Sequence, residues 1–156
     1  NKLFQNLENI KSINLNGNEF KYLNGDLFLN LKQLESIDLS QNRLDYLPRN
    51  LFSNNLESLK FLNLSSNSLK CLDKMQFRGL NKLIRLDLSC NKLQLLEDDL
   101  FSDLKSLKRL DLNRNFIRDL NMNLLFNGMK SLEIVDLSKN KLKNYYNIKF
   151  DFFFLI

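Results

Sequence analysis

The sequence predicts an α/β solenoid with the shape of a horseshoe: a concave parallel β-sheet of about six short strands, backed by a convex side of loops or short helices. The first observation is an asparagine that recurs every 24 or 25 residues in one apolar frame, L-x-x-L-x-L-x-x-N-x-L. The second is a phenylalanine late in each unit. The asparagines are Asn18, Asn42, Asn67, Asn91, Asn115 and Asn140, and the phenylalanines are Phe28, Phe52, Phe77, Phe101, Phe126 and Phe150.

Each frame predicts one short strand, because its apolar residues alternate with period two and so share one face. The frames begin at Ile10, Leu34, Leu59, Leu83, Leu107 and Leu132. The chain therefore divides into one partial and six full repeats within a single domain, 1–156. The partial repeat is 1–9, and the full repeats are 10–33, 34–58, 59–82, 83–106, 107–131 and 132–155.

The asparagines are predicted to form a structural ladder where the chain turns away from each strand. A side-chain amide carries both donors and acceptors, so it can satisfy backbone groups of the turn that no strand partner reaches. The phenylalanines fill the opposite wall of the core. Each repeat is then half a core and needs a neighbour to be stable.

The wording of the repeat carries a family resemblance. Leu86-Asp87-Leu88-Ser89-Cys90-Asn91 and its counterparts, with the late phenylalanine, resemble the typical class of animal extracellular leucine-rich repeats, as in Toll-like receptor ectodomains, Slit-like proteins and small leucine-rich proteoglycans. The resemblance implies a non-enzymatic module that binds a protein or another macromolecular ligand. It also implies part of a receptor ectodomain or of a secreted adhesion protein, located outside the cell or at its surface through segments beyond this one.

Two alternatives stay open: an intracellular, cytoplasmic scaffold for signalling proteins, and a remnant of a duplicated gene. Such domains end in cysteine-rich caps, whereas the two cysteines here lie in the interior, so we expect a fragment without caps. Near the end, Tyr145, Phe150, Phe153 and Ile156 keep the repeat register, while Phe152 and Phe154 add aromatic residues. This tail is expected to cover the last repeat or to mark an altered end. Its apolar run of five residues is too short for a membrane span.

The outward strand residues are the candidate binding surface. The residues between the inner apolar positions predict an acidic row with arginines beside it and apolar residues at its rims. The candidates are Phe61, Arg85, Asp87, Arg109, Asp111, Arg114, Ile134 and Asp136. Two interpretations compete. In the first, the aspartates are simply the common residue of the repeat motif, and the arginines offset the repulsion between their like charges. In the second, the patch is a protein-binding hot spot.

Other chemistries are disfavoured. The chain has no histidine, which removes histidine-based triads and histidine-ligated metals, so we predict no catalytic residues, metal site or cofactor. Calcium binding by the aspartate row is a minor alternative. The net charge of +5 allows basic rows beside the strands, but such rows are more often a solvated face, so nucleic acid is a disfavoured partner.

A glycosylation sequon and two cysteines complete the sequence features. Asn63-Leu64-Ser65 is an N-glycosylation sequon, and a glycan on Asn63 would cover part of the concave face. An unused sequon, produced by the repeat wording, is the alternative. Cys71 and Cys90 occupy different repeat positions, which favours two free thiols over a disulfide.

Overall fold

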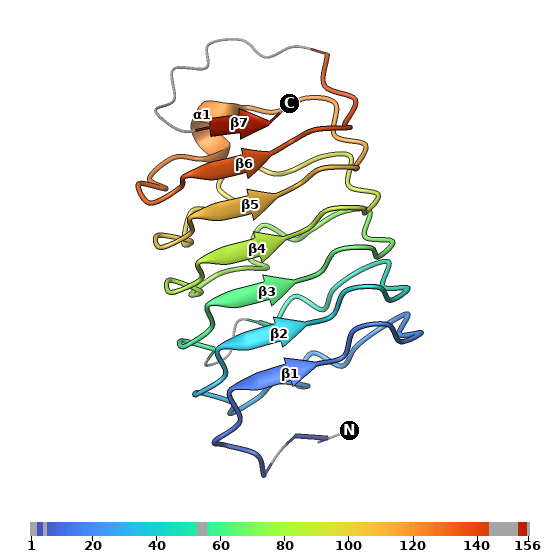
Figure 1. Cartoon of the computed structure of the whole chain (residues 1–156), viewed down its shortest axis with the longest axis vertical. Coiled ribbons are helices and arrows are strands. Elements are labelled where there is room, and N and C mark those ends of the chain that lie inside the picture. The colour runs from blue at the N-terminus through green and yellow to red at the C-terminus, as the bar shows by residue number, and fades with distance from the viewer. Residues whose placement is uncertain (1–2, 5, 53–55, 144–152, 156) are drawn as a thin grey trace.

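The computed structural model describes residues 3–4, 6–52, 56–143 and 153–155. Its strands stack into one parallel sheet in chain order, which confirms the predicted solenoid (Figure 1). The strands are β1 (Ser12–Asn14), β2 (Ser36–Asp38), β3 (Phe61–Asn63), β4 (Arg85–Asp87), β5 (Arg109–Asp111), β6 (Ile134–Asp136) and β7 (Phe153–Leu155).

Each strand pairs with the next at the same repeat position. Ile13 lies opposite Ile37, which lies opposite Leu62, and the order continues through Leu86, Leu110 and Val135. These central side chains are buried, while their neighbours on both sides face outward. The sheet thus places every outward strand residue in a row with its counterparts.

The late phenylalanines form the rear wall of the core. Phe4, Phe28, Phe52, Phe77 and Phe101 stack in sequence, with ring centroids 6.0–6.4 Å apart. Phe126 is buried in the same wall. Offset stacks of this kind stabilise beyond their burial alone. Because each ring contacts the ring of the next repeat, the repeats stabilise one another.

The convex side is built from hydrogen-bonded turns, with one short helix, α1 (Met122–Leu125), among the described residues. Asn121 caps that helix by accepting a hydrogen bond from the backbone of Leu124. The described residues contain no helix long and apolar enough to cross a bilayer.

The end of the chain departs from the predicted register. The sequence placed Phe153 late in repeat 132–155, on the rear wall, but its backbone pairs with Ile134 in β7, 19 residues after its partner instead of 24 or 25. Residues 153–155 of the Phe-rich tail therefore add a strand at the edge of β6, which agrees with the expectation that the tail covers the last repeat. Tyr145, Phe150, Phe152 and Ile156 lie outside the described residues.

Candidate concave binding face

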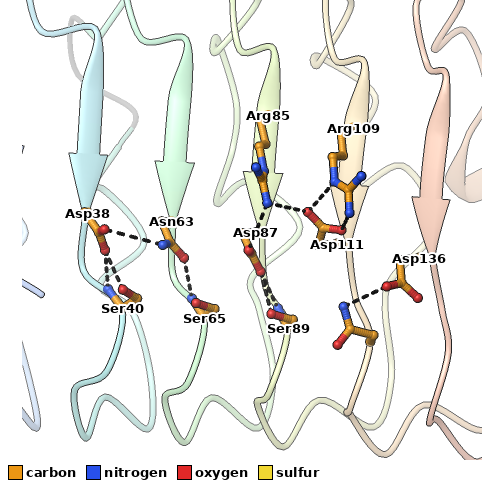
Figure 2. A network of polar contacts seen from close by, with 11 residues as sticks. Asp38, Ser40, Asn63, Ser65, Arg85, Asp87, Ser89, Arg109, Asp111 and Asp136 are labelled. Carbon is orange, nitrogen blue, oxygen red and sulfur yellow. Dashed lines mark hydrogen bonds and ion pairs between the residues drawn. The ribbon is translucent and has the colours of Figure 1, made fainter. Parts of the chain in front are cut away.

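The third residue of each strand from β1 to β6 carries an acidic or amide side chain, and in all of these strands but β5 it caps the turn that follows. Asp87 accepts hydrogen bonds from the backbone N–H and the hydroxyl of Ser89, at 3.0 and 2.6 Å (Figure 2). Asp38 does the same with Ser40. Asn14, Asn63 and Asp136 each accept from the backbone N–H two residues later. This geometry is an Asx turn, so most of the row has a local structural role.

Asp111 is the exception, because its carboxylate is held by two arginines. Arg109 binds it through Nε and Nη2, at 2.8 and 2.7 Å. Arg85, one strand away, donates to Oδ2 at 3.1 Å and also lies 3.6 Å from Asp87 (Figure 2). We refer to Arg85, Asp87, Arg109 and Asp111 as the arginine–aspartate cluster.

Burial separates the roles within this cluster. The side chain of Asp111 is only 3% exposed, so it orients the arginines and does not face a partner. Arg85 keeps half of its side chain exposed and Arg109 over a third. The hydrogen bond that Arg109 donates to Asp111 raises the pKa of Arg109, which therefore keeps its charge. A fixed guanidinium with free donors is preorganised for a carboxylate or carbonyl of a partner.

Phe61 lies beside this cluster on β3, directly opposite Arg85 in the sheet register. It is 46% exposed, a large fraction for a phenylalanine. Together with Asn63, Arg85 and Asp87 it lines a shallow depression of about 240 Å³ on the concave face. The face thus offers an aromatic side chain next to an oriented cation.

The remaining candidates lie at the margins. Ile134 and Asp136 on β6 are half-buried, and Asp136 accepts a hydrogen bond from the amide of Asn113 at 3.0 Å. Arg114 is exposed but sits in the turn after β5, with a φ of 56°. The structure therefore brings Phe61, Arg85 and Arg109 together and leaves Arg114 and Ile134 at the edges.

The predicted asparagine positions form a spine of hydrogen bonds that joins the turns after the strands. Asn91 donates to the carbonyls of Leu64 and Leu88 and accepts from the backbone of Leu69. Asn42, Asn67 and Asn115 repeat this pattern, and Asn140 follows it with part-buried bonds. Asn18 is exposed, and among the described residues its amide donates only to carbonyls of its own repeat.

The sequon asparagine and the cysteines have defined surroundings. Asn63 is half-buried, and the nitrogen that would carry a glycan lies 3.4 Å from Asp38 Oδ2. Glycosylation there stays a prediction. Cys71 and Cys90 are free thiols, the first exposed and the second half-buried in a turn with a φ of 55°.

Two ion pairs near the face were missed by sequence reasoning. Lys60 binds Glu35 at 2.7 Å, and Lys108 binds Glu133 at 2.8 Å, each just before a strand begins. Lys60 lowers the pKa of Glu35 through the hydrogen bond and the charge attraction. The sequence does carry a signal for these ion pairs, because it has opposite charges at the same position of adjacent repeats. Parallel strand pairing places such positions side by side.

A family model described as leucine rich repeat matches residues 1–44, 33–93 and 82–142. The chain belongs to the leucine-rich repeat family. This confirms the resemblance stated from the sequence. A search among curated proteins gave no match.

Solved structures agree with this assignment. The leucine-rich repeat domain of APL1 is 27% identical with a TM-score of 0.83, and the match covers 91% of this chain and 36% of that one. Toll, in the Drosophila Toll–Spatzle complex, is 28% identical with a TM-score of 0.75, at 90% and 22% coverage. TLR13, in its complex with ssRNA13, is 29% identical with a TM-score of 0.67, at 92% and 23% coverage. The chain thus spans about a quarter to a third of these relatives. Leucine-rich repeats of this kind are generally non-enzymatic protein-interaction modules.

Proposed function

We propose that this segment is the ligand-binding part of a leucine-rich repeat receptor ectodomain or secreted adhesion protein, and that its concave face binds a protein partner. The observation that carries the proposal is the arrangement of Phe61 beside the arginine–aspartate cluster. An exposed aromatic ring and a preorganised arginine are the residue types that dominate protein-binding hot spots.

Energetics favour these residues over the rest of the face. The cluster holds Arg85 and Arg109 in place through Asp111, so a partner loses less side-chain entropy when it binds them. The turn-capping carboxylates of Asp87 and Asp136 already have intramolecular partners. Binding energy is therefore expected to concentrate at Phe61, Arg85 and Arg109.

The relatives supply the context for the partner. Toll is solved with the protein Spatzle and TLR13 with an RNA. A protein fits this concave face better, because the two arginines and two aspartates of the cluster together carry no net charge to attract a phosphate backbone. An intracellular scaffold remains the alternative setting for the same binding face.

Site-specific photocrosslinking tests whether the concave face binds the partner and whether that partner is extracellular or intracellular. A photoreactive phenylalanine analogue is placed at Phe61, and a matched control carries it at Leu124, which is 43% exposed on the convex side. Both proteins are exposed to secreted and cytosolic fractions of the source cells. A partner captured from the secreted fraction through position 61 alone supports the proposal, and one captured only from cytosol supports the scaffold. Equal capture at both positions, or none at position 61, contradicts the concave assignment.

A further inference from the structure

The edge of the solenoid formed by the loops after the strands carries a row of exposed apolar side chains. Its members are Tyr22, Tyr46, Cys71 and Leu95, each four residues after a ladder asparagine. Tyr22, Tyr46 and Leu95 are 71%, 52% and 65% exposed, and Cys71 is also exposed. Single exposed apolar residues are ordinary, but a contiguous set marks an interaction surface.

Backbone hydrogen bonds keep this row continuous. The backbone N–H of Arg43 donates to the carbonyl of Phe20, that of Ser68 to Leu44, and that of Lys92 to Leu69. Each loop is therefore bonded to the loop of the preceding repeat, and equivalent residues of the four loops lie side by side. In Figure 1 these loops follow the strand arrowheads along one side of the sheet. The row is therefore separate from the concave face.

Two charged rows run beside the apolar row. The middle row, one residue earlier, is Lys21, Asp45, Lys70 and Gln94, and the outer row is Glu19, Arg43, Ser68 and Lys92. All but the half-buried Ser68 are exposed. In the middle row Asp45 is followed by Lys70, with Lys21 and Gln94 at the two ends; in the outer row Glu19 lies at one end, where it pairs with Arg43 at 2.6 Å, and Lys92 lies at the other. An alternation of this kind is complementary to its own reversed copy.

We propose that this edge pairs with the same edge of a second copy of the chain, in a two-fold symmetric contact with the two solenoids antiparallel. If the two-fold axis lies in the contact plane and runs perpendicular to the rows, each row faces the same row of the second copy, but in the reverse order. The apolar row spans four repeats, so its midpoint fixes the axis between Tyr46 and Cys71. Tyr22 then faces Leu95 of the second copy, and Tyr46 faces Cys71.

The same operation pairs the charges. Asp45 meets Lys70 of the second copy, and Glu19, which also pairs with Arg43 of its own chain, meets Lys92, each twice by symmetry. Lys21 meets Gln94 and Arg43 meets Ser68, so no like charges oppose one another in the three rows. A two-fold axis along the middle row would instead set Lys21, Asp45 and Lys70 each against its own copy, which repels. Charge complementarity therefore selects the antiparallel arrangement.

The size of the patch sets the expected strength. Twelve residues a side fall short of the roughly 20–30 of a stable interface, so we expect a weak dimer with a dissociation constant on the order of 100 μM. Sedimentation velocity over a concentration series on either side of that value should show a reversible monomer–dimer equilibrium. A chain that stays monomeric throughout overturns the proposal.

Charge reversal tests the register. Asp45→Lys and Lys70→Asp should each weaken the dimer about tenfold or more, and the double variant should restore it, because the pair is reversed and intact. Lys82→Asp, at an exposed site in the turn before β4, is the control and should leave association unchanged. The altered residues are exposed, and circular dichroism checks that each variant is folded. Failure of the double variant to recover contradicts this register.

Disulfide trapping provides an independent readout. In a background with Cys71→Ser and Cys90→Ser, Tyr22→Cys and Leu95→Cys proteins are oxidised separately and as a mixture. The proposed contact predicts covalent dimers mainly in the mixture, because position 22 of one copy faces position 95 of the other. Two copies of position 22 are separated by three strand spacings, roughly 14 Å, along the rows, which is too far for a disulfide. Efficient crosslinking of either variant with itself would overturn the antiparallel arrangement.

Discussion

Gln76 is a polar side chain in a row that is otherwise apolar. Leu51 and Leu100 occupy the same position in the adjacent repeats, and all three are buried. The Gln76 amide donates to the carbonyl of Pro48 at 3.1 Å, but its oxygen has no hydrogen-bond partner among the described residues. A buried acceptor without a partner destabilises the folded state.

Replacing Gln76 by leucine should therefore raise the free energy of unfolding by about 1–2 kcal/mol. The carbonyl of Pro48 keeps a partner, because the backbone of Leu51 also donates to it. Urea unfolding measures the change, and Leu100→Gln serves as the reverse substitution, which should lower stability. A Gln76→Leu protein less stable than the wild type would show that the oxygen is satisfied after all.

Glu35 gives a prediction about acid stability. Its pKa is lowered, chiefly by the hydrogen bond from Lys60 and then by the charge of that lysine. A lowered pKa in the folded state means that the pair stabilises the fold above the unfolded pKa and that this contribution is lost as the pH falls through the folded pKa. In Lys60→Gln, the pKa of Glu35 should move back up toward its ordinary value, as followed by carboxyl NMR. The same titration in Lys108→Gln should leave Glu35 unchanged; an unchanged pKa in both variants would rule out the assigned cause.

At the scale of the element, the asparagine spine joins each repeat to the next. The carbonyls of Leu64 and Leu88 each accept from two successive asparagines, and the Asn91 oxygen accepts from the backbone of Leu69. Asn91→Ala leaves that buried N–H unpaired and should lower the free energy of unfolding by about 2–3 kcal/mol. Asn18→Ala should cost less than about 0.5 kcal/mol, because Asn18 is exposed. Equal losses in chemical denaturation would contradict a role in linking repeats.

The strands and turns could be predicted from the sequence wherever they follow the period of the repeat. Strand positions, the phenylalanine wall and the turn after each strand come from periodicity, which parallel stacking converts directly into contacts. β7 was not predicted, because it pairs 19 residues after β6 and so breaks the period. The buried Gln76 was also missed, since a single polar residue does not disturb the pattern.

The candidate site was predictable only in outline. Asp87 and Asp111 share the same L-D-L wording, yet one caps a turn and the other is buried beneath two arginines. The difference arises because Arg85 and Arg109 both reach Asp111, which depends on side-chain conformation across adjacent strands. The sequence indicated basic rows in the loops after the strands, but not the apolar row beside them, because Tyr22, Tyr46, Cys71 and Leu95 share no single residue type.

At the scale of the whole molecule, the solenoid keeps the two proposed binding surfaces apart. The concave face carries Phe61 and the arginine–aspartate cluster, while the apolar row lies along the edge beside it. Each repeat contacts only its neighbours, so an exposed substitution on one surface should leave the other intact. Variants of the edge and of the concave face can therefore be interpreted separately.

Binding through the concave face is tested most directly by calorimetry with the partner captured through Phe61. The affinity of that partner is measured for the wild-type protein and for Arg85→Ala. Lys105→Ala, an exposed site in the turn after Phe101, is the matched control. Binding through the concave face predicts a loss of about tenfold or more in affinity for Arg85→Ala, equivalent to about 1.4 kcal/mol, and no change for the control. An Arg85→Ala protein that binds as tightly as the wild type would contradict the concave face as the binding surface.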